Sequence, residues 1–263
     1  MKLPFSAFRI LFAAGALLGL LETGAGAAWA GMPETIERVK PSIVAVGTFQ
    51  KTRSPAFAFR GTGFAVGDGT LIATNAHVLP EALQTEGLES IMVMIAGVEG
   101  SGPQPREAKT VAIDRQHDLA LLRVTGAPLP AMRLGNPATV REGQTALFTG
   151  FPIGSVLGLF PVTHRGMIAS ITPIALPSAT AQQLDERLIR RLQSGAFPVF
   201  QLDATAYPGN SGSPLYDIET GAVIGIMNMV FVKGTKETAL SQPSGISFAV
   251  PVQFLQELLR TAN

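Results

Sequence analysis

Short apolar stretches recur along most of the chain, and glycine, proline and other turn-forming residues separate them. The stretches are rich in valine, isoleucine, phenylalanine and threonine, and each has the length of a single strand. This pattern predicts an all-β chain built as a sandwich or a barrel. Strands are expected at residues 42–49, 63–66, 70–74, 91–95, 119–124, 145–148, 166–171, 199–202, 222–229 and 246–250.

Two segments have helical rather than strand spacing. Residues 181–192 carry leucine at every fourth position, at Leu184, Leu188 and Leu192, with charged residues between them. Side chains at this spacing lie on one face of a helix, so an amphipathic helix is expected there. The apolar positions of residues 251–259 likewise predict a short C-terminal helix that packs against the strands.

The N-terminal segment has the three parts of a secretory signal. Lys2 and Arg9 carry positive charge, residues 10–21 are apolar, and an alanine lies on either side of Trp29, as at a cleavage site. The apolar run is shorter than the roughly 20 residues that span a bilayer. We therefore expect residues 1–30 to be removed and the mature protein to be periplasmic or secreted, with no stable membrane anchor. The alternative is a retained anchor.

Composition and charge exclude several classes of protein. The 20 basic residues nearly balance the 19 acidic ones, so the basic excess of a nucleic-acid-binding protein is absent. The chain has no cysteine, which excludes disulfide scaffolds, cysteine-ligated metals and thiol nucleophiles. The three histidines lack the spacing of a helical zinc site, and neither a metal nor another cofactor is expected. Glycine and proline make up about 18% of the chain against about 12% on average, which favours a turn-rich β fold.

Two polar residues at the ends of predicted strands are candidates for acid–base chemistry. His77 follows an apolar strand, and an imidazole is the side chain whose pKa is closest to neutrality, as a general base requires. Asp118 opens another apolar strand, where a buried carboxylate would need a partner such as an imidazole N–H. Taken separately, a histidine at a strand end such as His77 is more often structural, and Asp118 could equally cap the loop at residues 113–117.

The most specific signal is the segment Gly209-Asn-Ser-Gly-Ser-Pro214. Gly209 and Gly212 flank Ser211 and permit a tight turn that a substrate backbone can approach closely. Such a turn can direct backbone amides at one point and form an oxyanion hole. We expect this hole at Gly209, Asn210 and Ser211, with the amides of Gly209 and Ser211 as donors. The alternative is an ordinary polar loop.

The order His77, Asp118, Ser211 is the order in chymotrypsin-type enzymes. The histidine and the aspartate lie in the first half of the chain and the serine in the second. Residues 126–130 are the best candidate for a passage between the halves, which gives expected units at residues 31–130 and 131–263. A cleft between two barrels would bring the three residues together.

At these positions the chain resembles trypsin-like serine peptidases, and among them the bacterial HtrA/Deg type. The matching stretches are residues 74–78, 118–121, 203–214, 223–226 and 245–251. The resemblance implies two six-stranded antiparallel β-barrels of the chymotrypsin type, with residues 181–192 as an inserted helix. It also implies a protease domain, which here is expected without the PDZ domain that usually follows in HtrA/Deg proteins.

The resemblance implies roles for the residues of the site. Ser211 would be the nucleophile, His77 the base that takes its proton, and Asp118 the group that orients and stabilises the imidazole. The strand at residues 224–228 would pair with the substrate backbone. The substrate-binding residues would be Thr205, Ile226, Met227 and Asn228.

The same residues bear on specificity. Thr205 is neutral and lies where the family places the base of the primary specificity pocket, so small or aliphatic side chains are expected before the scissile bond. Ser213 replaces the glycine that is usual in the family, a form also found in glutamyl-endopeptidase-like members. Those members need a basic group or a histidine for the substrate carboxylate. His164 could have that role, or it could be a polar residue on the surface of a strand.

The sequence thus predicts an exported serine endopeptidase that acts on proteins or peptides through an acyl-enzyme intermediate. The alternative is a catalytically silent barrel that binds extended peptides as a chaperone or scaffold. An esterase is less favoured, because the Gly-x-Ser-x-Gly elbow in an alternating β/α chain is missing. Assembly into an oligomer is left open.

Overall fold

The computed structural model describes residues 31–83, 88–96, 102–173, 197–228 and 245–262. The expected signal peptide at residues 1–30 and the expected helix at residues 181–192 lie outside the described residues. None of the helices in the described part of the chain has the length and apolar character that crossing a bilayer requires.

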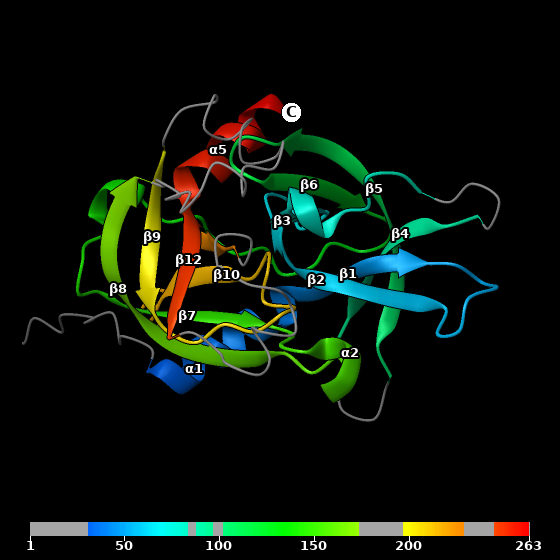
Figure 1. Ribbon diagram of the computed structural model, residues 1–263, viewed down its shortest axis with the longest axis horizontal. Helices are drawn as coiled ribbons and strands as arrows, with labels where there is room; N and C mark the ends of the chain where they lie inside the picture. Colours follow the sequence, from blue (N-terminus) through cyan, green and yellow to red (C-terminus); the bar gives the residue numbers. More distant parts are fainter. Residues whose placement is uncertain (1–30, 84–87, 97–101, 174–196, 229–244, 263) are drawn as a thin grey trace, which may run out of the picture.

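The described strands form two closed antiparallel barrels of six strands each (Figure 1). The first barrel has the order β1-β2-β3-β6-β5-β4, and the second has the order β10-β11-β12-β9-β8-β7. This arrangement confirms the all-β fold of two six-stranded barrels. The first barrel consists of β1 (Ile43–Phe49), β2 (Phe57–Val66), β3 (Leu71–Asn75), β4 (Ser90–Ile95), β5 (Gln104–Asp114) and β6 (Leu119–Val124). The second consists of β7 (Thr145–Gly150), β8 (Val162–Pro173), β9 (Pro198–Asp203), β10 (Pro214–Asp217), β11 (Val223–Met227) and β12 (Ile246–Pro251).

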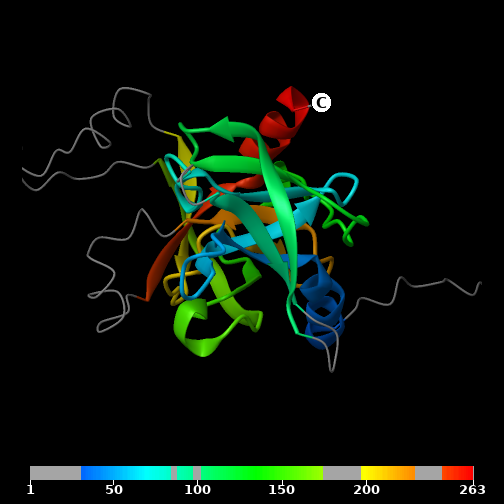
Figure 2. The ribbon, with the colours of Figure 1, turned by 90° about the vertical axis from the view of Figure 1, so that its right-hand side faces the viewer.

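Short helices lie outside the barrels. They are α1 (Met32–Val39), α2 (Gly154–Leu157) and α5 (Val252–Thr261), with 3-10 turns η1 (Lys40–Ser42), η2 (Ala76–Val78) and η4 (Pro137–Thr139). The expected C-terminal helix is confirmed as α5. Figures 1 and 2 show α5 and α1 on opposite sides of the molecule.

Helix α1 was not expected from the sequence, because its eight residues are too few for a clear periodic signal. It leads into the first barrel but is held by the second. Thr35 donates its hydroxyl to Glu219 O at 3.3 Å, and Arg38 donates to Thr220 O at 3.2 Å. The helix therefore ties the start of β1 to the turn between β10 and β11.

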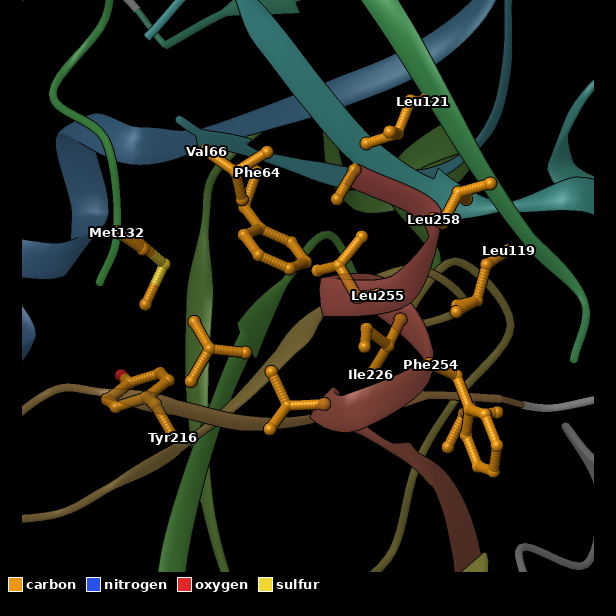
Figure 3. Packing of buried hydrophobic residues seen from close by; sticks show 14 of the residues in the cluster. Phe64, Val66, Leu119, Leu121, Met132, Tyr216, Ile226, Phe254, Leu255 and Leu258 are labelled. Atoms are coloured by element: carbon orange, nitrogen blue, oxygen red, sulfur yellow. The ribbon is translucent and has the colours of Figure 1, made fainter. Parts of the chain in front are cut away.

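The two barrels share one apolar core in addition to their own interiors. In the shared core, side chains of the first barrel meet side chains of the second and of α5 (Figure 3). Labelled examples are Phe64, Leu119 and Leu121 from the first barrel, Tyr216 and Ile226 from the second, and Leu255 and Leu258 from α5. Burial of this continuous apolar surface holds the barrels in a fixed relation, so residues of both can build one site.

Candidate active site

The end of β3 and the start of β6 place His77 beside Asp118. The two strands pair in antiparallel register, with Asn75 opposite Leu119. The carbonyl oxygen of Asp118 accepts hydrogen bonds from the Asn75 side chain and the Ala76 amide, both at 3.0 Å. The 3-10 turn η2 then directs the His77 ring back toward the same residue. Local strand pairing thus joins two residues that are 41 positions apart.

Both carboxylate oxygens of Asp118 bind His77. Oδ2 lies 2.6 Å from Nδ1 of the imidazole, and Oδ1 accepts the His77 amide at 2.9 Å. An ionised carboxylate only accepts, so Nδ1 carries the proton and Nε2 is left to act as a base. Asp118 is only 6% exposed and has φ of +56°, in the left-handed region that aspartate and asparagine tolerate better than most residues.

A third donor reaches the same carboxylate from the second barrel. The side-chain amide of Asn228, which is fully buried, donates to Asp118 Oδ2 at 2.8 Å. The sequence placed Asn228 among the substrate-binding residues, whereas the structure directs its side chain at Asp118. Sequence reasoning missed this contact because the two residues lie 110 positions apart and meet only when the barrels pack.

The loop that carries Ser211 is held by neighbours on several sides. Thr62 of β2 donates its amide to Ser211 O at 2.8 Å, and the Gly212 amide donates to Met227 O at 3.0 Å. Gly212 has φ of +84°, and a Cβ at this position would lie 2.1 Å from Thr62 O. Only glycine allows this close approach of the loop to β2.

The amides of this loop fall into two groups. Asn210 donates its amide to Tyr207 O at 2.9 Å, and Ser213 donates its amide to Asn210 O at 3.0 Å. Among the described residues, the amides of Gly209 and Ser211 donate to no protein acceptor, and they are available to a ligand oxygen. The expectation that Asn210 contributes to the oxyanion hole is corrected: its amide is used within the loop and its side chain is buried.

Ser211 lies close to the turn that carries His77. A Cβ at Gly61 of β2 would lie 3.0 Å from Ser211 O and 2.7 Å from Val78, the residue after His77. Ser211 itself is 5% exposed. In the described part of the chain, His77 is hydrogen-bonded to Asp118 but not to Ser211. Such bonds are often long before a substrate binds.

The expected substrate-binding residues differ in their surroundings. Ile226 and Met227 are fully buried in the apolar core, and Thr205 is half-buried in the loop after β9. The expected pairing of substrate with residues 224–228 is wrong for the part that forms β11. This strand already pairs with β10 on one edge and β12 on the other, so it offers no free edge. The role of Thr205 stays a prediction.

His117 forms a second pair with a carboxylate. Its Nδ1 lies 2.6 Å from Asp114 Oδ2, and its amide donates to Asp114 Oδ1 at 3.0 Å, as in the pair of His77 with Asp118. The ring, however, stacks on Phe254 of α5 at 3.8 Å between centroids and meets the edge of Phe197 at 4.7 Å. This pair therefore anchors α5 to the loop before Asp118.

His164 lies inside the second barrel. It is half-buried, stacks on Phe148 of β7 at 5.0 Å between centroids and lies near Tyr207. Burial lowers the pKa of His164 below its ordinary value, which favours the neutral ring. Within the described ranges, no group of three or more histidine and carboxylate side chains could hold a metal ion.

Residues 61–226 match the sequence profile of the trypsin-like peptidase domain, and this range includes His77, Asp118 and Ser211. The chain belongs to the trypsin-like peptidase family. Among its relatives is a probable periplasmic serine endoprotease, DegP-like, of Pseudomonas savastanoi pv. phaseolicola, 28% identical over 75% of this chain and 33% of that protein. Another is the mitochondrial serine protease HTRA2 of Drosophila willistoni, 32% identical over 79% of this chain and 39% of that protein.

Solved structures support the same family. The HtrA-type protease AlgW with a tripeptide is 25% identical and superposes with a TM-score of 0.63 over 88% of this chain and 63% of the other. This peptidase therefore resembles HtrA-type proteases in both sequence and fold. It spans between a third and two fifths of the length of the two curated relatives described above.

Proposed function

We propose that this chain is an exported serine endopeptidase. The observation that carries the proposal is the carboxylate of Asp118, which binds the Nδ1 side of His77 at 2.6 Å and leaves Nε2 as the free base. The Ser211 loop lies next to this pair and presents the two free amides of Gly209 and Ser211. Family membership supports the same assignment, because peptidases of this family use these residue types in this order.

The proposed reaction has two stages. Ser211 Oγ attacks the carbonyl carbon of the peptide bond while its proton passes to His77 Nε2, and the carbonyl electron pair moves to the oxygen. The amides of Gly209 and Ser211 stabilise this oxyanion, and Asp118 stabilises the imidazolium. Collapse breaks the C–N bond, the leaving amine takes the proton from Nε2, and the acyl group stays on Ser211. Water then releases the acyl group by the same steps.

The preferred substrate is proposed to carry a small or aliphatic side chain before the scissile bond. The support is the neutral Thr205, which is half-buried in the loop after β9. Cleavage of a peptide library followed by mass spectrometry tests this preference. Cleavage mainly after arginine or lysine would contradict it.

Export is proposed from the signal at residues 1–30 and from the similarity to a probable periplasmic endoprotease of Pseudomonas. The first described element, α1, begins at Met32, so cleavage after Ala30 leaves it intact. N-terminal sequencing of protein recovered from the periplasm or the medium tests this proposal. A mature chain that begins at Gly31 is expected, and recovery only in the uncleaved form would contradict it.

The activity is tested by fluorophosphonate labelling of the wild-type protein and of Ser211→Ala, with the modified peptide located by mass mapping. Labelling of the wild type at Ser211, lost in the variant, is expected together with hydrolysis of casein. Folded protein that does not label would instead favour the silent peptide-binding barrel. Turnover of a short ester without casein hydrolysis would favour an esterase.

A further inference from the structure

One buried residue of the first barrel makes hydrogen bonds to two residues of the Ser211 loop. Thr62 lies on β2 and is 0% exposed. Its amide donates to Ser211 O at 2.8 Å, and its hydroxyl donates to Gly209 O at 2.7 Å. Within this loop, Ser211 and Gly209 are also the two residues whose amides donate to no acceptor among the described residues.

The same hydroxyl also accepts a hydrogen bond from the Phe151 amide at 3.1 Å, from the loop that follows β7. This loop contacts the other side of the Ser211 loop. Ile153 donates its amide to Pro208 O at 2.7 Å, and a Cβ at Gly209 would lie 2.3 Å from Phe151 O. Gly209 is thus enclosed between β2 and the loop after β7.

Hydrogen bonds fix each carbonyl group of residues 208–211. Those of Pro208 and Asn210 accept from the amides of Ile153 and Ser213, and those of Gly209 and Ser211 accept from Thr62. Because a peptide unit is planar, fixing a carbonyl also fixes the direction of the next amide. The carbonyls of Pro208 and Asn210 share peptide units with the free amides of Gly209 and Ser211.

Gly209 is the weak point of this arrangement. Its φ is +103°, a conformation from which a residue without Cβ rotates readily to others. The Thr62 hydroxyl is the group that holds the Gly209 carbonyl toward β2. Without it, the peptide unit between Gly209 and Asn210 would keep only the hydrogen bond from its amide to Tyr207 O, and a rotation of this unit would turn the amides on either side.

We propose that Thr62 is a positioning residue that keeps the amides of Gly209 and Ser211 directed at the substrate carbonyl, an inference that rests on the proposed peptidase function. It acts through the loop and touches no reacting atom. Removal of one oxyanion donor lowers turnover by about 100- to 1,000-fold. A donor that is only misdirected should cost less, about 10- to 100-fold in kcat with little change in KM.

The test compares three variants. Thr62→Val keeps the shape and the backbone amide but lacks the hydroxyl, and Thr62→Ser restores the hydroxyl. Thr149→Val is the matched control, because Thr149 is equally buried and its hydroxyl bonds Tyr216 and Thr163, away from the Ser211 loop. For each protein, kcat and KM, the rate of fluorophosphonate labelling, the affinity for a peptide aldehyde and the thermal midpoint are measured.

The expected result is a loss of kcat, labelling rate and aldehyde affinity in Thr62→Val that is absent from Thr62→Ser and Thr149→Val. Equal losses in Thr62→Val and Thr149→Val, following their thermal midpoints, would overturn the inference. Crystal structures of the wild type and Thr62→Val give a readout that needs no activity. A rotated Gly209 carbonyl in Thr62→Val supports the inference, and an unchanged one overturns it. This structural comparison stays valid even if the wild-type protein fails to label with fluorophosphonate and the proposed function is wrong.

Discussion

Asn228 in the second barrel donates its side-chain amide to the carboxylate of Asp118 in the first, over 2.8 Å. Together with the two contacts from His77, this gives the buried carboxylate three donors. A buried charge is stable only when it is paired and hydrogen-bonded, and here the partners come from both barrels. The position of the Asp118 carboxylate, and through it the His77 ring, therefore depends on how the barrels pack.

The contact from Asn228 should contribute to activity. Replacing it in Asn228→Ala removes one donor from a charged acceptor, and such a hydrogen bond is worth about 1.5 to 3 kcal/mol. We expect kcat/KM to fall by about 10- to 100-fold while the protein still folds. Steady-state kinetics with a thermal melt as control checks this. Unchanged kcat/KM in a folded variant would show that His77 alone holds the carboxylate.

Asp118→Asn separates the charge of this residue from its backbone conformation. Asparagine tolerates the left-handed φ of +56°, so the fold should be kept. An amide cannot stabilise an imidazolium as a carboxylate does and favours the wrong tautomer of His77, so kcat should fall on the order of 10⁴-fold. The rate of fluorophosphonate labelling reports the loss.

Asp118→Ala is the matched comparison. It should lose activity as well and also be less stable, because alanine at a positive φ is strained. Denaturant unfolding of both variants checks the difference. Equal stability of the alanine and asparagine variants would contradict the role assigned to the backbone conformation.

Much of the fold follows from local patterns in the sequence, and the strands that these patterns do not reveal have physical reasons for it. Strands such as β6, buried along most of its length, give a clear apolar run. Strand β5 (Gln104–Asp114) was missed because only Ala108 is fully buried among its eleven residues. Strand β10 (Pro214–Asp217) was missed because four residues carry too short a pattern.

The candidate site also has a part that the sequence predicts and a part that only the structure shows. His77, Asp118 and Ser211 lie in motifs that can be read locally, whereas the contacts that hold them cross between barrels. Thr62 binds Gly209 over 147 positions of sequence, which no local pattern reveals. The sequence does indicate that another segment approaches Thr62 closely, because glycines on both sides of a residue within a strand are typical of close backbone approach.

Gly150 and Ser213 should be coupled in stability. A Cβ at Gly150 would lie 2.0 Å from Ser213 Oγ and 2.8 Å from Thr62 Oγ1. We therefore expect Gly150→Ala to cost about 1 to 3 kcal/mol of unfolding free energy, as overpacking does. Ser213→Gly removes the nearest atom, so the same change should cost less in that background.

A double-mutant cycle by urea unfolding measures this coupling. An interaction energy of about 0.5 to 3 kcal/mol is typical for residues in contact. Strictly additive effects would mean that Gly150 is needed for its closeness to Thr62 or Asn210 rather than to Ser213. Both outcomes report how tightly Gly150 packs against the residues next to the Ser211 loop.

The stability of the protein should depend on the ionisation of His164. Burial lowers the pKa of this imidazole below its ordinary value of 6.5, so the unfolded chain binds a proton at a pH where the folded protein does not. The contribution to stability is therefore complete above about pH 6.5 and is lost as the pH falls toward the lower pKa of the folded state. In His164→Phe the ring still stacks on Phe148 but does not titrate. Unfolding free energies measured from pH 8 to pH 5 should thus fall less steeply in the variant, and parallel curves for the two proteins would contradict the assignment.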